Sequence, residues 1–376
     1  MLQFRCRLHG KVNPTHTGNV YMSMSLRLPV VLLALAAALA LAAPLHAQEA
    51  PTPDASPVSN APAPEDMGSA PVATFKVQTN LVSVYFTAYG KNNQPAADLK
   101  KDDCTIFEDR VAQTTKSFDK VVDLPLTIGI LLDTSGSQQK VLQMEQDSGS
   151  AFLKQVLTPK DEAFLISFDV NVDLLADYTN NAAELERAMD KAQINVGGGF
   201  GGGGIPGLGQ GPVSVQKPRG TLLYDAVYLA AHDKLHQESG RKVIILLTDG
   251  EDEGSQETLK SSLEAAQKSN VIIYVILLAD RAGYAQMGAM YTGDRLMRQM
   301  TDETGGRTID VGTNGKKLED AFQQIQDELR TQYQISYTPE NKVLDGGFRE
   351  LHIQCDGVSK IQTRKGYYAV AQGSDE

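Results

Sequence analysis

The stretch Leu126-Thr-Ile-Gly-Ile-Leu-Leu-Asp-Thr-Ser-Gly-Ser137 decides the predicted fold. It begins as a strand that is apolar on both faces, and such strands are typical of parallel sheets covered by helices. Three more apolar strands follow and alternate with segments of helical periodicity. The strands are predicted at 126–132, 163–168, 242–247 and 271–278, and the helices at 141–157, 182–192, 221–238, 256–269, 294–304 and 316–331. This order predicts a doubly wound α/β domain with a parallel sheet over residues 124–332.

The sequence on either side of this domain alternates between apolar and polar residues, which is the pattern of half-buried β-strands. The N-terminal flank, 74–123, places four apolar residues on one face between Val82 and Ala88. The C-terminal flank, 333–370, contains three alternating runs of the same kind. We therefore expect both flanks to form one small β-sandwich-like domain into which the α/β domain is inserted.

The residues before the N-terminal flank are expected to direct export. The uncharged run at 28–43 is shorter than the roughly 20 residues that a membrane-spanning helix needs, and small residues follow it. An uncleaved membrane anchor remains the alternative to cleavage. The expected segments are a signal peptide at 1–47 with its true start at Met22 or Met24, a Pro- and Ala-rich disordered tether at 48–73, and a tail at 371–376. The expected location is periplasmic, envelope-associated or extracellular, with membrane attachment only if the signal segment stays uncleaved.

The charge of the chain excludes one class of partner. Its 376 residues contain 35 Lys and Arg against 46 Asp and Glu, which gives a formal net charge of −11. The signal segment contains basic residues and no acidic ones, so its removal would make the chain more acidic still. A duplex-binding protein needs a basic face to displace counterions, and we therefore expect no nucleic-acid partner.

Cys104 and Cys355 are the two cysteines that would remain after removal of the signal segment, which contains Cys6. Both lie on the apolar side of an alternating run, and we interpret them as two buried free thiols. A disulfide between them is the alternative, because an exported protein meets an oxidising compartment.

Oxygen-bearing side chains gather at the predicted carboxyl edge of the sheet. Asp133, Ser135 and Ser137 follow the first central strand, Thr221 opens a helix, and Asp249 follows a later strand. Three loops thus bring carboxylates and hydroxyls to one edge, where ligands bind in open α/β sheets. All are hard oxygen ligands, so the expected ion is Mg²⁺, with Mn²⁺ or Ca²⁺ as alternatives.

These residues resemble the metal-ion-dependent adhesion site (MIDAS) of the von Willebrand factor type A (VWFA) domain family. The resemblance covers 124–332 and all five positions, and it implies a Rossmann-like fold. It implies that Ser135, Ser137 and Thr221 bind the metal directly, while Asp133 and Asp249 act wholly or partly through water. The flanking sequences EDRVAQTTKSF and TRKGYYAV are similar to those of secreted bacterial proteins of a VWFA-related group found in acidobacteria.

The resemblance implies a non-enzymatic module in which the bound cation takes an Asp or Glu carboxylate from a partner protein. The alternative is a structural or assembly component of an envelope complex, in which the metal only stabilises the fold. An enzyme is not expected, because the sequence has no serine elbow and no nucleophilic Cys with a His partner. The pair His232 and His236 has zincin-like spacing but no evident third ligand, and we expect both on a solvent-facing helix.

The glycine-rich run at 197–211 is not interpreted as a nucleotide site. A phosphate-binding loop would follow a strand and end in Gly-Lys-Ser or Gly-Lys-Thr, and this run does neither. Because the run precedes the Thr221 loop, we hypothesise that it is a mobile lid beside the metal site.

Overall fold

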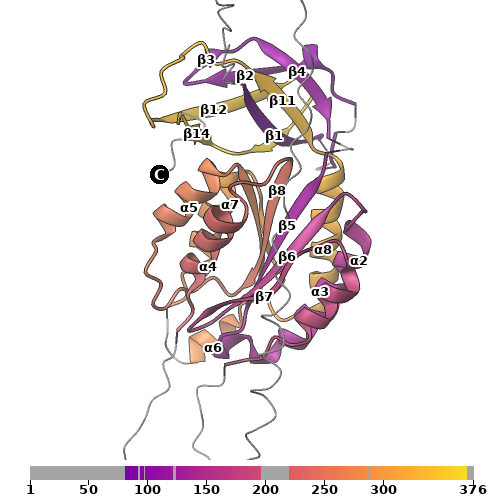
Figure 1. Cartoon of the computed structure of the whole chain (residues 1–376), viewed down its shortest axis with the longest axis vertical. Helices are drawn as coiled ribbons and strands as arrows, with labels where there is room; N and C mark the ends of the chain where they lie inside the picture. The colour runs from indigo at the N-terminus through magenta and orange to yellow at the C-terminus, as the bar shows by residue number, and fades with distance from the viewer. Residues whose placement is uncertain are drawn as a thin grey trace, which may run out of the picture. The chain divides into compact units, whose positions relative to one another are not determined.

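The central sheet contains six strands in the order β10-β9-β8-β5-β6-β7 (Figure 1). Their bounds in this computed structural model are β5 Leu126–Asp133, β6 Glu162–Phe168, β7 Val172–Thr179, β8 Arg241–Thr248, β9 Val271–Leu277 and β10 Thr308–Asp310. Neighbouring strands run parallel except β7, which pairs antiparallel with β6. Every residue of β5 is buried, as a strand covered on both faces requires. The predicted α/β fold with a mostly parallel sheet is confirmed.

The structure describes residues 81–370 except 92–93, 97, 122–123, 196–219, 287 and 289. The predicted signal peptide, tether and tail lie outside the described residues. So does the glycine-rich run at 197–211, and the hypothesis of a lid stays untested.

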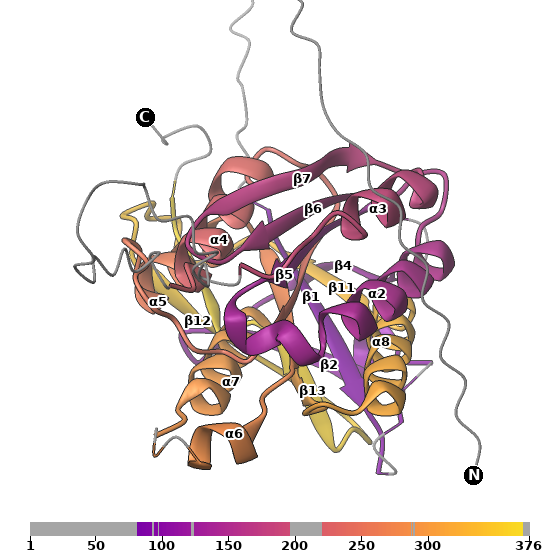
Figure 2. The same cartoon turned by 90° about the horizontal axis from the view of Figure 1, so that it is seen from below.

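Helices cover both faces of the central sheet (Figures 1 and 2). One face packs against α2 (Leu142–Val156), α3 (Ala182–Met189) and α8 (Gly315–Arg330). The other packs against α4 (Leu223–Leu229), α5 (Leu259–Lys268) and α7 (Gly293–Thr304). Side chains of β5 alternate between these two cores, with Ile130 in the first and Leu131 in the second. A strand apolar on both faces thus holds two layers of helices together.

We call residues 126–330 the central unit; its elements β7, β10 and α6 (Arg281–Gln286) and its short 3-10 helix at Gly136–Lys140 were not predicted from the sequence. Strand β7 is an edge strand with a half-exposed, irregular pattern, β10 has three residues, and α6 has no buried residue. The expected helix at 221–238 is also shorter, because α4 passes into a π-helical turn at Ala230–Lys234. These elements lack the long apolar period on which the sequence predictions depended.

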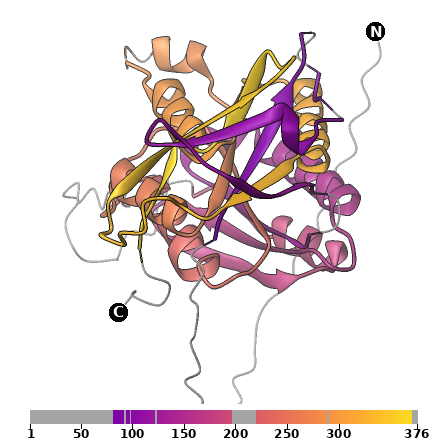
Figure 3. The ribbon, with the colours of Figure 1, turned by 90° about the horizontal axis from the view of Figure 1, so that it is seen from above.

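The flanks form two four-stranded antiparallel sheets, β13-β1-β11-β4 and β14-β12-β2-β3 (Figure 3). The N-terminal flank supplies β1 Val82–Tyr89, β2 Cys104–Glu108, β3 Val111–Ala112 and β4 Thr115–Lys120, and the C-terminal flank supplies β11 Tyr333–Tyr337, β12 Phe348–Cys355, β13 Lys360–Thr363 and β14 Gly366–Tyr368. Strands from opposite ends of the chain pair directly, β1 with β11 and β2 with β12. Apolar side chains of these four strands share one core. We call these eight strands the flank unit.

Cys104 and Cys355 form a disulfide, which corrects our interpretation of two free thiols. They lie directly opposite each other in the β2–β12 pair, with their Cα atoms 4.1 Å apart. The alternating pattern placed both on the apolar side but could not reveal the register between strands that are 251 residues apart.

The flank unit and the central unit contact each other through buried polar groups. The Gln362 amide of β13 donates to the Glu328 carboxylate of α8 over 3.2 Å, and the Tyr89 hydroxyl of β1 donates to Gln362. The guanidinium of Arg307 lies 2.6 Å from the same carboxylate. These contacts satisfy a buried charge and join α8 to both flanks.

None of the helices in the described part of the chain is both long enough and apolar enough to cross a membrane.

Candidate metal site at the carboxyl edge of the sheet

Four of the five predicted site residues line a single depression of about 900 Å³ at the carboxyl edge of the central sheet. These are Ser135 and Ser137 after β5, Thr221 just before α4, and Asp249 after β8. Asp133, the last residue of β5, is fully buried and is not part of the lining. The structure therefore brings together the three loops that the sequence indicated.

Asp133 connects two of these loops through hydrogen bonds. Its Oδ1 accepts from the backbone N–H of Ser135 at 3.0 Å, and its Oδ2 accepts from the Thr248 hydroxyl at 2.6 Å. The Thr248 hydroxyl oxygen accepts in turn from the N–H of Gly250 at 3.0 Å. Asp133 thus fixes the ends of β5 and β8 relative to each other.

The two serine hydroxyls lie together in the lining of the depression. Ser135 Oγ and Ser137 Oγ are 2.9 Å apart, which is within hydrogen-bond distance. Ser135 has extended backbone angles before the short 3-10 helix at Gly136–Lys140, and hydroxyls two residues apart therefore meet on the same side. Two adjacent hydroxyl oxygens form a donor set that suits a hard divalent cation.

Thr221 is held against the loop that follows β8. The Thr221 N–H donates to the carbonyl of Glu253, and the Glu253 N–H donates to the carbonyl of Thr221, both over 3.0 Å. A Cβ on Gly220 would lie 2.9 Å from the Glu253 carbonyl oxygen, so the close approach requires glycine. This reciprocal pairing places the Thr221 loop beside Asp249.

Both carboxylate oxygens of Asp249 accept hydrogen bonds from the protein. Oδ2 accepts from the Tyr284 hydroxyl at 2.7 Å, and Oδ1 accepts from the N–H of Glu251 at 3.2 Å. The backbone carbonyl of Asp249 accepts from the Tyr291 hydroxyl at 2.8 Å. Sequence reasoning missed both tyrosines. The available signal was the end of the predicted strand 271–278, since its following residues must emerge at the same edge of the sheet.

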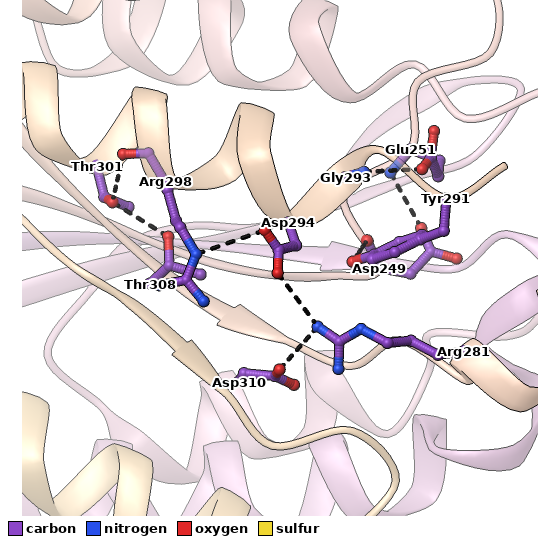
Figure 4. A network of polar contacts seen from close by, with 10 residues as sticks. All are labelled: Asp249, Glu251, Arg281, Tyr291, Gly293, Asp294, Arg298, Thr301, Thr308 and Asp310. Carbon is purple, nitrogen blue, oxygen red and sulfur yellow. Dashed lines mark hydrogen bonds and ion pairs between the residues drawn. The ribbon is translucent and has the colours of Figure 1, made fainter.

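Glu251 joins the Asp249 loop to the start of α7 (Figure 4). Its Oε1 accepts from the N–H groups of Thr292 at 2.6 Å and Gly293 at 2.8 Å. A carboxylate at a helix N-terminus satisfies unpaired N–H groups and complements the helix dipole. The acidic run after Asp249 therefore includes a helix cap.

Acidic side chains lie close together beneath the depression. Burial, followed by the charge of Asp249, raises the pKa of Asp133. Burial and the charges of both aspartates raise the pKa of Glu145, a fully buried residue in the first turn of α2, well above its usual range. Neither carboxylate oxygen of Glu145 has a hydrogen-bond partner among the described residues. Such a cluster favours a cation, because a positive ion offsets the repulsion among buried carboxylates.

The donor set differs from that of a transition-metal site. In the described part of the chain, no three His, Cys, Asp or Glu side chains converge to hold a metal ion. A cation at the five predicted residues would instead contact hydroxyl oxygens, with the carboxylates of Asp133 and Asp249 close by to balance its charge. The residues present fit Mg²⁺ or a similar hard ion by this chemistry.

The metal-free protein is expected to lose stability as the pH rises. The folded-state pKa values of Asp133 and Glu145 are raised, so both groups stabilise the fold when protonated, and this contribution is lost as the pH rises through those values. We expect the free energy of unfolding of the EDTA-treated protein to be about 1–3 kcal/mol larger near pH 5.5 than near pH 7.5. Urea unfolding at both pH values checks this.

Glu145→Gln should reduce this pH dependence, whereas Glu319→Gln on the exposed face of α8 should leave it unchanged. Equal stability of the metal-free wild type at the two pH values would contradict the prediction.

The chain is similar to several solved structures. No family model matches the chain, and no curated protein matches its sequence. Among solved structures, the conserved hypothetical protein BatB from Bacteroides thetaiotaomicron is 16% identical with a TM-score of 0.39, over 53% of this chain and 97% of that chain. A von Willebrand factor type A protein from Catenulispora acidiphila is 12% identical with a TM-score of 0.41, over 78% of this chain and 74% of that chain.

A third similar structure is proximal thread matrix protein 1 from the mussel byssus, with a zinc-occupied MIDAS motif. It is 17% identical with a TM-score of 0.42, over 59% of this chain and 50% of that chain. One of these three structures is described as a von Willebrand factor type A protein, and another contains a MIDAS motif.

Proposed function

We propose that this chain, whose central unit is VWFA-like in fold, is an exported, non-enzymatic protein-binding module. It would hold Mg²⁺, with Mn²⁺ or Ca²⁺ as alternatives, at Asp133, Ser135, Ser137, Thr221 and Asp249. The ion would then bind an Asp or Glu carboxylate of a partner protein. The observation that carries this proposal is the pair of serine hydroxyls, 2.9 Å apart, in an open depression above buried Asp133.

The charges of the site support the capture of an anionic ligand. Two carboxylates formally balance a divalent ion, but both Asp133 and Asp249 already accept hydrogen bonds at each of their oxygens. A carboxylate that shares its lone pairs with N–H and O–H donors is a weaker ligand for a metal. The ion would therefore keep an affinity for one more anionic oxygen.

The two histidines with zincin-like spacing lie outside the described lining of the depression. Neither His232 nor His236 is part of it; His232 contacts Asp233 over 2.6 Å, and His236 bonds to the Ser269 hydroxyl. The described lining offers hydroxyls, carboxylates, side-chain amides and Lys140.

Calorimetric titration of EDTA-treated full chain tests the proposal in two steps. Mg²⁺ is titrated first, and acetate is then titrated into the Mg²⁺-loaded and the metal-free protein. We expect Mg²⁺ binding and acetate binding that requires the ion. An Asp-containing peptide should bind in the same way and be released by EDTA.

Two outcomes would contradict the proposal in different ways. If Mg²⁺ does not bind, the metal site itself is wrong. If Mg²⁺ binds and raises the melting temperature without any carboxylate binding, the ion only stabilises the fold, and the protein is better described as a structural component.

A further inference from the structure

Tyr284 is placed to control how Asp249 uses its carboxylate. The tyrosine belongs to α6, lines the depression, and donates its hydroxyl hydrogen to Asp249 Oδ2 over 2.7 Å. The other oxygen of Asp249 accepts from the backbone N–H of Glu251. Any direct contact between Oδ2 and an ion would therefore compete with an existing hydrogen bond.

Ion pairs on two sides hold α6 in this position. Lys140, at the end of the serine loop, pairs with Asp280 over 2.9 Å, and the Asp280 carboxylate also accepts from the N–H of Gly283 at 3.0 Å. The Arg281 guanidinium lies 2.7 Å from Asp310 and 3.6 Å from Asp294 (Figure 4). The segment that carries Tyr284 is thus tied to the serine loop, to β10 and to α7.

Tyr291, the neighbour of Tyr284, provides an internal comparison. Its ring lies 5.3 Å from the ring of Tyr284, measured between centroids, and its hydroxyl also donates to Asp249. The acceptor, however, is the backbone carbonyl and not the carboxylate. Both hydroxyls therefore donate to Asp249. Only the Tyr284 hydroxyl occupies a carboxylate oxygen that an ion could otherwise contact.

We propose that Tyr284 is a positioning residue that keeps Asp249 from binding the ion directly and so preserves the affinity of the ion for a partner carboxylate. This inference rests on the proposed metal site. Occupation of Oδ2 by an O–H donor makes that oxygen a weaker ligand. A weaker bond to Asp249 leaves more of the positive charge of the ion for the anion that arrives from outside.

The proposal predicts opposite changes in two affinities for Tyr284→Phe. Freed Oδ2 should bind the ion directly, so Mg²⁺ affinity should rise by about 3- to 10-fold, the effect of one modest hydrogen bond. Affinity of the Mg²⁺-loaded protein for acetate should fall by a similar factor. Tyr291→Phe, the matched control, should change both affinities less than twofold. Calorimetry measures both, and melting curves check that each variant is folded.

Other results for Tyr284→Phe would overturn the proposal. If Tyr284 merely orients Asp249, its loss should weaken Mg²⁺ binding, as loss of an orienting hydrogen bond generally does by about 10- to 100-fold, and the proposal is then wrong. Unchanged affinities, or equal effects in both variants, also overturn it. If the wild type binds no Mg²⁺, the proposed function fails and this inference fails with it. If the wild type binds Mg²⁺ and acetate normally, a negative result for Tyr284→Phe counts against this inference alone.

Discussion

Asp133→Asn should lower the affinity for Mg²⁺ by about 10- to 100-fold, the usual cost of losing a group that supports metal binding from outside the direct ligands. The same change should raise the stability of the metal-free protein at neutral pH by about 1–2 kcal/mol, because it removes a fully buried charge that Asp249 opposes. A gain in stability together with a loss of binding is the expected sign of a residue retained for function.

Calorimetry with Mg²⁺ and urea unfolding in EDTA measure the two effects. Glu319→Gln is the control, since Glu319 lies on the exposed face of α8, outside the described lining of the depression. It should change Mg²⁺ affinity by no more than a few fold, through the loss of one screened charge. Asp133→Asn protein that still binds Mg²⁺ as the wild type does would exclude Asp133 from the site.

Replacement of both Cys104 and Cys355 with serine should lower the free energy of unfolding by about 2–5 kcal/mol. The disulfide closes a loop that includes the whole central unit, because the two cysteines are 251 positions apart in the sequence. Loss of the crosslink increases the freedom of the unfolded chain and opens the core shared by β2 and β12. Affinity for Mg²⁺ should change less than twofold, because the five site residues lie in the central unit.

Urea unfolding of the wild type with and without dithiothreitol provides the matched comparison. The reductant should destabilise the wild type and have no effect on the double serine variant. The same urea midpoint for the wild type and the double variant would show that the bond contributes nothing to stability. A loss of Mg²⁺ affinity in a folded variant would instead show that the flank unit supports the metal site.

The part of the fold that the sequence predicts well is the part with strong periodicity. Strand β5 is apolar at nearly every position, and the structure buries all of it. The site residues were predicted to meet because each follows a strand or opens a helix at one edge of the sheet, and the structure brings their loops together. Direct metal binding by Ser135, Ser137 and Thr221 stays a prediction.

The features that escaped prediction depend on contacts between distant residues. Cys104 lies opposite Cys355 because of the register in which β2 pairs with β12. The sequence of neither strand alone determines that register. Tyr284 lies in a short helix without an apolar face, so nothing in its local sequence connects it to Asp249. Alternation and capping signals report on neighbours along the chain, whereas these contacts are decided by how the elements pack.

The pairing of the flanks also determines how the central unit is joined to the rest of the protein. The chain enters it from β4 and leaves it into β11, and these strands are hydrogen-bonded neighbours, with Lys120 opposite Tyr333. Beside them, the N–H of Val121 donates to the carbonyl of Gln332 over 2.8 Å. Entry and exit therefore lie side by side. A domain with closely spaced ends can be replaced as a unit. Another ligand-binding domain could therefore be inserted between β4 and β11, in evolution or by engineering, without a change in the strand register of the flank unit.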